Sequence, residues 1–370
     1  MTNQAERAPA FDAPLGEHAQ GAERLWEALR AGDKDAAWRF KWEHPRFRGR
    51  PVRDVDPAGL DEDDARLVVA RQRGFESWAD LERFAQDVQH DPLLRRFEEA
   101  VEAVVAGDLD RLRRFLKEDP ALVRTRSTRR HHATLLHYIA ANGVEGERQR
   151  TPPNAVEVAN LLFDSGAEPD ALADMYDNQC TTLSLLVSSS PPAAAGLQAP
   201  LAETLIDHGA GLDGPGTNWQ SAIETALAFG HQETAQVLAR RVEYLEDLAV
   251  AAGLGRTEEV KRLLPSGNPL ARHTALALAA QHGHLDVVRL LLDGGEDPNR
   301  YNPEGFHAHS TPLHQAVWAE HGDVVRLLVE RGARLDMRDT VYEGTPLDWA
   351  EYGKRTVIAD FLRAQGGRVG

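Results

Sequence analysis

Cysteine and long apolar runs are scarce in this chain of 370 residues, and each scarcity excludes a class of protein. Cys180 stands alone, which excludes an internal disulfide framework and is typical of a reducing compartment. No uninterrupted apolar run approaches twenty residues, and residues 1–20 contain no apolar stretch long enough for a secretory signal. We therefore expect a soluble, cytoplasmic protein that does not span or bind a membrane.

Positive charge is also in deficit. The chain has 42 basic and 58 acidic residues, for a formal net charge of −16. This balance opposes non-specific binding to nucleic acid or to anionic lipid, so we expect neither as a partner. Only five of the basic residues are lysine, and this bias toward arginine is typical of GC-rich bacterial genomes.

Sequence motifs of the common enzyme classes are absent as well. The chain has no nucleophile elbow, phosphate-binding loop, zinc-hydrolase helix or dinucleotide fingerprint. We therefore expect no cofactor and no metal, and a binding protein is favoured over an enzyme.

The chain does contain an internal repeat. The segment TALALAAQHGHLDVVRLLLDGGEDPN, from Thr274, aligns with TPLHQAVWAEHGDVVRLLVERGARLD, from Thr311. In both copies the threonine stands 21 residues before the glycine of the closing turn, Gly295 or Gly332. Self-similarity with a period in the thirties indicates a solenoid of stacked units.

Each part of the repeat has a physical role. The Thr311 hydroxyl caps a first helix, and Pro312 is tolerated in the first turn of that helix. Gly283 and His284 turn the chain into a second helix with an apolar stripe, and Gly295 ends that helix in a left-handed cap. One such unit cannot bury its own apolar face, so several must stack.

The TPLH start and the GH dipeptide between the helices resemble the ankyrin consensus. This resemblance implies an all-α ankyrin-repeat solenoid of stacked helix pairs with short β-fingers. It also implies structural roles for the TPLH and GH histidines, which are His137, His314, His231, His284 and His321. We expect about eight repeats over residues 93–370, with copies starting near Phe97, Thr134, Thr181, Ser221, Glu246, Thr274, Thr311 and Thr345.

The region before this array is more divergent. Segments 25–40 and 65–85 each place a glycine between two amphipathic helices, so we predict two helical hairpins that cap the array over residues 19–92. The second segment resembles those that precede ankyrin arrays in uncharacterised bacterial proteins. Residues 1–18 are predicted to be a mobile tail.

Irregular spacing marks the places where the array departs from a generic scaffold. Extra residues lie at 145–154, in SSSPPAAAGLQAP and at 300–310, whereas successive fingers are missing or short between Ser221 and Thr274. Insertions in repeats form loops that often carry binding residues. Long fingers at 176–180 and 300–310 on either side of a central gap could enclose a pocket for a small molecule or a peptide end.

Aromatic and amide side chains occupy the positions just before the inter-helix glycine and the predicted finger tips. Tyr and Trp are enriched at binding hot spots, although packing on neighbouring repeats would explain Phe229 and Trp318 equally well. The candidate binding residues are Asn142, Trp219, Phe229, Gln281, His282, Tyr301, Asn302, Phe306, Trp318 and Tyr352.

Polar side chains on the fingers beside the central gap suggest an alternative. A general base needs only one such group in a dry cleft, and the candidates are His132, Asp174, Tyr176, Asp177, His307 and His309. In an extended finger His307 and His309 would point to the same side, but a zinc site needs three or four ligands and the local sequence supplies no others.

These observations favour a non-catalytic scaffold that recognises a protein or peptide through a concave groove and finger tips. The alternative is an enzyme or small-molecule binder that uses a pocket at the central gap. Capped solenoids are usually monomeric, so we expect a monomer.

Overall fold

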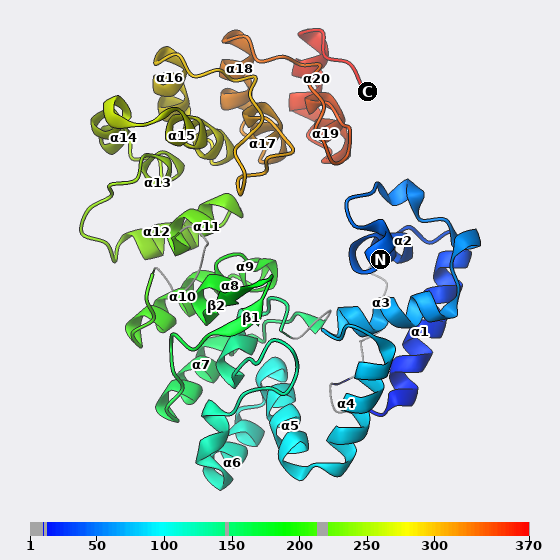
Figure 1. Cartoon of the computed structure of the whole chain (residues 1–370). Coiled ribbons are helices and arrows are strands. Elements are labelled where there is room, and N and C mark those ends of the chain that lie inside the picture. Colours follow the sequence, from blue (N-terminus) through cyan, green and yellow to red (C-terminus); the bar gives the residue numbers. More distant parts are fainter. Residues whose placement is uncertain (1–9, 11–12, 145–147, 213–220, 370) are drawn as a thin grey trace. The chain divides into compact units, whose positions relative to one another are not determined.

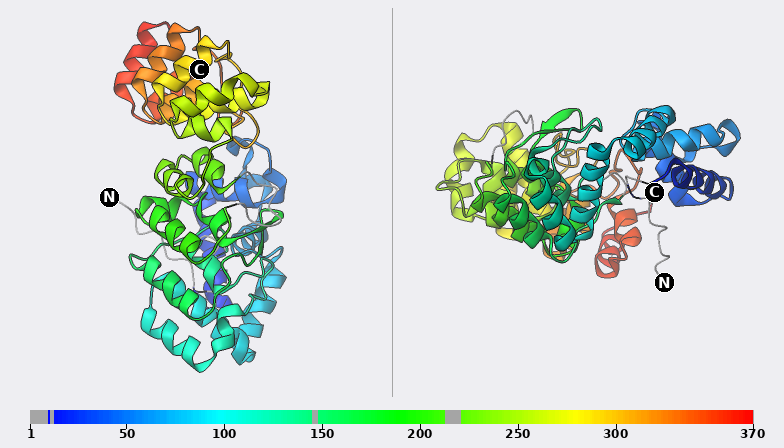
Figure 2. Two further views of the ribbon diagram at one scale, coloured as in Figure 1. Left: turned by 90° about the vertical axis from the view of Figure 1, so that its left-hand side faces the viewer. Right: turned by 90° about the horizontal axis from the view of Figure 1, so that it is seen from below.

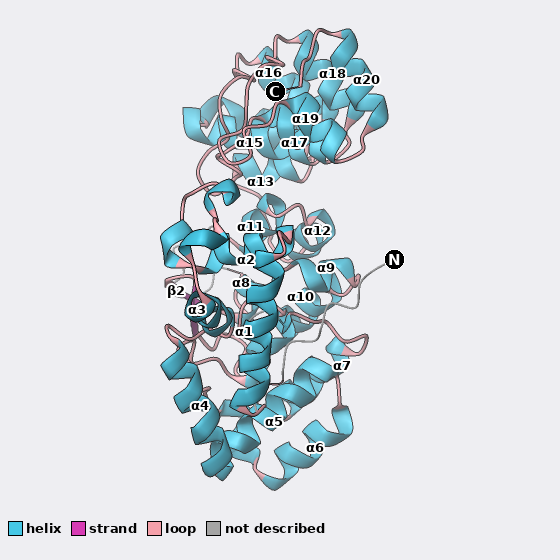
Figure 3. Ribbon diagram, turned by 90° about the vertical axis from the view of Figure 1, so that its right-hand side faces the viewer, coloured by secondary structure: helices cyan, strands magenta, loops and turns pink. Residues whose placement is uncertain are grey.

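The computed structural model describes residues 10, 13–144, 148–212 and 221–369. The chain divides into two compact units, residues 1–218 and 219–370, and each is described by itself. Helices dominate both units (Figure 1; Figure 3). Among the described residues, no helix has the length and apolar character needed to cross a bilayer.

The first unit begins with two helical hairpins and continues with helix pairs. Its α-helices are α1 (Leu15–Arg30), α2 (Lys34–Glu43), α3 (Glu62–Gln72), α4 (Trp78–His90), α5 (Pro92–Ala106), α6 (Leu109–Glu118), α7 (Ala155–Asp164), α8 (Thr182–Leu186), α9 (Ser190–Ala194) and α10 (Gln198–Asp207). Short 3₁₀ helices are η1 (Pro45–Phe47), η2 (Val52–Asp54), η3 (Pro57–Gly59), η4 (Pro120–Arg124) and η5 (Leu135–Ala140). Strands β1 (Ala173–Met175) and β2 (Asn178–Cys180) form an antiparallel finger in which Ala173 pairs with Cys180.

The second unit is a stack of helix pairs, drawn in yellow-green to red in Figure 2. Its helices are α11 (Ala222–Ala228), α12 (Gln232–Ala239), α13 (Leu248–Gly253), α14 (Thr257–Leu263), η7 (Leu264–Ser266), α15 (Pro269–Gln281), α16 (Leu285–Asp293), α17 (Pro312–Trp318), α18 (Gly322–Glu330), α19 (Pro346–Tyr352) and α20 (Thr356–Ala364).

The predicted helix pairs of the array are present. Within the described ranges they are α5/α6, η5/α7, α8/α10, α11/α12, α13/α14, α15/α16, α17/α18 and α19/α20. The inserted SSSPPAAAGLQAP segment contributes α9 rather than an open loop. The predicted start of the array at residue 93 falls in the first turn of α5, while the compact units divide after residue 218.

The predicted tail is too long. Helix α1 begins at Leu15, and His18 in its first turn is buried. Residues 15–18 are therefore helical. The amphipathic pattern of α1 begins ten residues before segment 25–40, in which the sequence predicts the first helical hairpin. Residues 1–9 and 11–12 lie outside the described part of the chain.

Capping residues start helices α17 and α19 where the sequence indicates. Thr311 caps α17 in a reciprocal box with His314, and Pro312 occupies the first turn. Thr345 caps α19 in the same way with Asp348. The His314 ring also hydrogen-bonds the Gly344 carbonyl at 3.2 Å, so this imidazole ties its helix to the next finger. This confirms the structural role implied for the TPLH histidine.

Thr274 does not cap its helix, contrary to its position in the repeat. Helix α15 begins at Pro269, where Asn268 accepts a hydrogen bond from the Ala271 amide. The Thr274 hydroxyl instead donates to the Leu270 carbonyl within the helix, at 2.9 Å. Because no β-finger precedes this repeat, the chain remains helical back to the next available cap.

The glycine and the histidine of the GH turn contact each other across neighbouring repeats. A Cβ added to Gly283 would lie 2.5 Å from Nδ1 of His321, and one added to Gly255 would lie 2.6 Å from Nδ1 of His284. The His321 ring donates from Nε2 to the Gln281 carbonyl at 3.0 Å. Each imidazole therefore needs a bare glycine in the preceding repeat.

The core of the second unit combines small residues of the first helices with branched residues of the second helices. Ala279 and Ala316 are fully buried beside Val288 and Leu291. The alanines let first helices pack closely, and each buried leucine contributes about 2 kcal/mol of burial free energy. This packing fixes which ends of the helices remain exposed.

Candidate functional site

Exposed aromatic rings gather at the ends of α17 and α19. Trp318 is 46% exposed and Tyr352 is 84% exposed, and their rings stack with centroids 6.4 Å apart. Trp349 packs edge-on against Trp318 at 6.0 Å. We call these three residues the aromatic platform. The structure thus brings together Trp318 and Tyr352, which the sequence singled out separately.

Buried polar contacts hold the platform rigid. The Trp349 indole Nε1 donates to Oδ2 of Asp339 at 2.9 Å. Burial would raise the pKa of Asp339, but hydrogen bonds from Tyr342, Trp349, Gly344 and Val341 hold that pKa below its usual value. The charged carboxylate therefore fixes both the indole and the turn before α19.

Two further predicted binding residues of the second unit are exposed. Phe229 follows the last residue of α11 and is 47% exposed. Tyr301 is also exposed, and its hydroxyl donates to the Arg338 carbonyl at 2.7 Å. The candidate Trp219 lies outside the described residues.

Four other predicted binding residues of this unit are buried, so their predicted exposure is wrong. They are Gln281, His282, Asn302 and Phe306. Gln281 Nε2 donates to the Ala228 carbonyl at 3.0 Å, and His282 Nε2 donates to the Leu227 carbonyl at 2.8 Å. Where fingers are missing, Gln281 and His282 satisfy the last carbonyls of α11 instead of facing a partner.

The long segment 300–310 also contacts the end of α11. His307 Nε2 donates to the Ala228 carbonyl at 2.8 Å. The segment is a series of turns, and His307 has a left-handed φ of 61°, so our assumption of an extended finger is wrong. The His309 ring packs on Trp349 with centroids 5.9 Å apart. No group of three or more potential metal ligands occurs among the described residues.

Asn142 of the first unit is fully engaged within the protein. Its Oδ1 accepts from the Tyr176 hydroxyl at 2.6 Å, and its Nδ2 donates to the Leu185 carbonyl at 2.7 Å and to Ser188 Oγ at 2.8 Å. A Cβ on the neighbouring Gly143 would lie 2.5 Å from Met175. Asn142 therefore anchors the β1–β2 finger rather than presenting a free amide.

The predicted catalytic candidates fall into two sets, one in each unit. His132, Asp174, Tyr176 and Asp177 belong to the first unit, and the His132 ring pairs with the Asp174 carboxylate at 2.7 Å. His307 and His309 belong to the second unit and make the contacts described above.

A cleft of 580 Å³ lies beside the β1–β2 finger of the first unit. Asp174, Tyr176 and Asp177 line it from the finger, but Arg48, Arg71, Glu76, Arg130 and His131 also contribute. No sequence motif predicts this second group, because its members come from separate segments of the chain. Only the fold of the unit brings them together.

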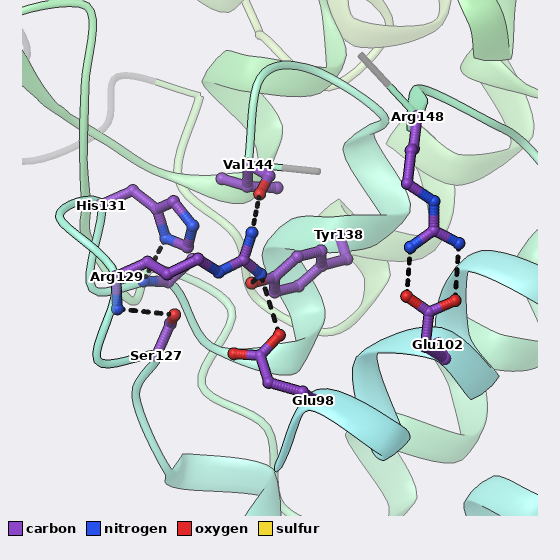
Figure 4. Close-up of polar contacts among 9 residues, drawn as sticks. Glu98, Glu102, Ser127, Arg129, His131, Tyr138, Val144 and Arg148 are labelled. Carbon is purple, nitrogen blue, oxygen red and sulfur yellow. Dashed lines mark hydrogen bonds and ion pairs between the residues drawn. The ribbon is translucent and has the colours of Figure 1, made fainter. Parts of the chain in front are cut away.

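A buried polar network supports the segment that carries Arg130 and His131 (Figure 4). Arg129 Nη2 contacts the Glu98 carboxylate at 3.2 Å and donates to the Tyr138 hydroxyl at 2.5 Å. Arg129 Nη1 donates to the Val144 carbonyl at 3.2 Å. The network thus joins α5, η5 and the wall of the cleft.

The insertion at 145–154 is held to α5 as well, where it is described. Arg148 makes a two-point ion pair with Glu102 through both guanidinium nitrogens, one of them 2.6 Å from Oε2 (Figure 4). Asn154 Nδ2 donates to the Gly107 carbonyl at 2.8 Å. Residues 145–147 lie outside the described part.

Comparison with known proteins agrees with this repeat architecture. A family model described as "Ankyrin repeats (3 copies)" matches residues 248–339. Human cyclin-dependent kinase inhibitor 2A is 35% identical over 126 residues, which cover 32% of this chain and 77% of that protein. The chain belongs to the ankyrin-repeat family.

Other similarities are more limited. The ankyrin repeat-containing protein P1E11.10 of Schizosaccharomyces pombe is 43% identical over 70 residues, covering 19% of this chain and 31% of that protein. The crystal structure of the human ASB11 ankyrin repeat domain is similar over 75% of this chain and 99% of that chain, at 22% identity and with a TM-score of 0.38. These relatives are eukaryotic, and the bacterial origin stays a prediction from composition.

Proposed function

We propose that this chain is a non-catalytic scaffold that binds a protein or peptide partner through the aromatic platform of its second unit. The observation that carries this proposal is the exposure of Trp318 and Tyr352, stacked on each other and braced by the partly buried Trp349. Exposed aromatic clusters on a rigid support are typical of binding surfaces, because they offer large apolar area at little cost in conformational entropy.

The neighbouring residues favour a partner of mixed character. Glu320 and Glu351 are exposed beside the platform, and each is paired with an arginine, Arg355 at 2.8 Å and Arg363 at 2.8 Å. An apolar centre with a charged, solvated rim is the usual arrangement of a protein interface. Phe229 and Tyr301 are further exposed aromatic residues of this unit.

The relatives support the same class of function. The name of cyclin-dependent kinase inhibitor 2A states that it inhibits a kinase, which is a protein. For this chain we propose only that it recognises a protein. We also propose that the chain acts as a monomer in the cytoplasm.

The test compares three forms of the full chain in affinity capture from lysate of the organism that encodes it. These are the wild type, the Trp318→Ala/Tyr352→Ala variant and a control variant, Tyr244→Ala. Tyr244 is an exposed aromatic residue of the same unit that is not part of the platform. Partners that depend on the platform should be depleted only by the double substitution.

Each depleted partner is then titrated as a purified protein. Removal of one hot-spot side chain costs about 2 kcal/mol or more, so the double variant should weaken binding at least about 30-fold. Equal capture and equal affinity for all three forms would overturn the assignment of the platform as the binding site.

A further inference from the structure

Two residues that line the cleft of the first unit each have a buried hydrogen-bond donor that the described part of the chain does not use. Nε of Arg71 and Nε2 of His131 are both buried and have no hydrogen-bond partner in the described part of the chain. Both residues line the cleft. An unsatisfied buried donor costs about 1–3 kcal/mol, so two in one cleft call for an explanation.

The protonation of His131 follows from its surroundings. The Ala133 amide donates to Nδ1 at 3.1 Å, so Nδ1 is the acceptor and the proton lies on Nε2. Burial, and secondarily the charge of Arg129, lowers the pKa of His131 well below its ordinary value of 6.5. The ring is therefore neutral at physiological pH and offers a single N–H donor.

Arginine side chains from three segments supply positive charge to the same cleft. Arg71 and Arg130 share the Glu76 carboxylate, with Arg71 Nη1 at 3.1 Å from Oε2. A guanidinium has five N–H donors, so each arginine keeps donors beyond its contact with Glu76. Arg48 lines the cleft as well, and no ion pair of its side chain occurs among the described residues.

One carboxylate of the inner lining, Glu76, is paired with arginines, and a second, Asp174, is hydrogen-bonded. Glu76 is bound by two arginines, and Asp174 is bound by His132 and Gln179. Asp177 is exposed at the tip of the finger. The unused buried groups of Arg71 and His131 are thus donors, which are complementary to an acceptor-rich anion.

We propose that this cleft binds a small anionic ligand through a carboxylate or phosphate group. Arg71 and His131 provide the buried donors, and Arg48 and Arg130 provide charge at the opening. Planar guanidinium groups bind carboxylate and phosphate through paired hydrogen bonds. The volume of 580 Å³ is within the range of small-molecule sites, so the ligand is larger than the bare anionic group. The aromatic platform belongs to the other unit, and this proposal does not depend on it.

The experiment uses isothermal titration of the full chain with inorganic phosphate and, separately, with succinate, both at constant ionic strength maintained with chloride. Saturable binding of either probe is expected. Binding of phosphate alone identifies a phosphate ligand, and binding of succinate alone identifies a carboxylate ligand. Failure of both probes to saturate at about 10 mM overturns the proposal.

Variants assign the binding to the cleft. Arg48→Gln and Arg71→Gln should each weaken binding about tenfold or more. Arg113→Gln removes an exposed arginine of the same unit that does not line the cleft, and it should leave binding unchanged. His131→Asn keeps an acceptor for the Ala133 amide but removes the Nε2 donor, so it should also weaken binding.

Thermal unfolding of each variant shows whether the first unit is still folded. Arg48 is exposed, so its substitution tests the site even where the buried variants are destabilised. If Arg48→Gln binds both probes as tightly as the wild type and Arg113→Gln do, the cleft is not the site and the proposal is wrong.

Discussion

Arg129 and Glu98 form an ion pair that is almost completely removed from solvent, with side chains 1% and 0% exposed and a nitrogen–oxygen distance of 3.2 Å. The pair joins the middle of α5 to the segment that leads to the cleft (Figure 4). Desolvating two charges is expensive, and the network offsets this cost through the additional bonds of Arg129 to Tyr138 and Val144.

Glu98→Gln should lower the free energy of unfolding by about 3 kcal/mol, because it removes the carboxylate charge that faces the buried Arg129 guanidinium. The same substitution in an exposed pair is the control. Glu118 pairs with Arg96 at 3.1 Å on the surface, and Glu118→Gln should cost less than about 1 kcal/mol. Urea unfolding of both variants measures the difference, and similar losses would contradict the assigned role of the buried pair.

Gly283→Ala should destabilise the second unit more than Gly295→Ala does. Both glycines have left-handed φ angles, 76° and 90°, so each alanine carries a backbone penalty of about 1 kcal/mol. Only at Gly283 would the new Cβ meet the His321 ring, at 2.5 Å, whereas nothing lies within 4 Å at Gly295. We expect an additional loss of about 1–3 kcal/mol at Gly283 in urea unfolding. Equal losses would show that the imidazole can move aside.

Buried histidines should make the protein less stable at mildly acidic pH. Burial lowers the pKa of His18, His137, His282 and His314 to about 4. An unfolded histidine titrates near 6.5, so the unfolded state takes up protons first as the pH falls from 6.5 toward 4. Each of these groups should lower the free energy of unfolding by about 2 kcal/mol between pH 7.5 and pH 5.

Glu224 acts in the opposite direction, because burial and the charge of Asp247 raise its pKa to about 7. One such group offsets only part of the effect of the histidines. The matched variant is His282→Gln, which can keep a donor to the Leu227 carbonyl without titrating. Its stability should depend less steeply on pH than that of the wild type, and parallel profiles would refute the assignment.

His307→Ala should loosen segment 300–310 with a modest loss of overall stability. The Ala228 carbonyl keeps its bond from Gln281, so the expected cost is about 1 kcal/mol. Hydrogen exchange of the amides in this segment should accelerate. Glu304→Ala, at an exposed position of the same segment, should leave exchange unchanged. Unchanged exchange in both variants would show that the His307 contact does not hold the segment.

Much of the fold could be predicted because its determinants are local. Thr311 and Pro312 start a helix through bonds within one turn, and Gly295 ends another because it tolerates a left-handed backbone. The exposure of Trp318 and Tyr352 also followed from their place in the repeat. In these cases the positions of the neighbouring repeats are set by the period, so a local pattern implies the tertiary contact.

Where the repeat spacing is irregular, predictions of side-chain exposure from the local sequence are wrong. Gln281 and His282 occupy the same repeat positions as Trp318 and Ala319, yet they are buried against the end of α11. The cause is the missing finger, which exposes backbone carbonyls that must find donors, and no feature of residues 281–282 themselves reveals this need.

The repeat family, the helix pairs and the capping of most first helices follow from the amino-acid sequence, since each depends on residues a few positions apart. Which candidate residues lie together depends on the packing of the whole chain. It paired Arg129 with Glu98, and it brought Arg48, Arg71 and His131 into one cleft from segments with no common pattern. Long-range contacts of this kind depend on how the irregular segments fold back, because side chains far apart in sequence satisfy each other's buried polar groups only once the chain has packed.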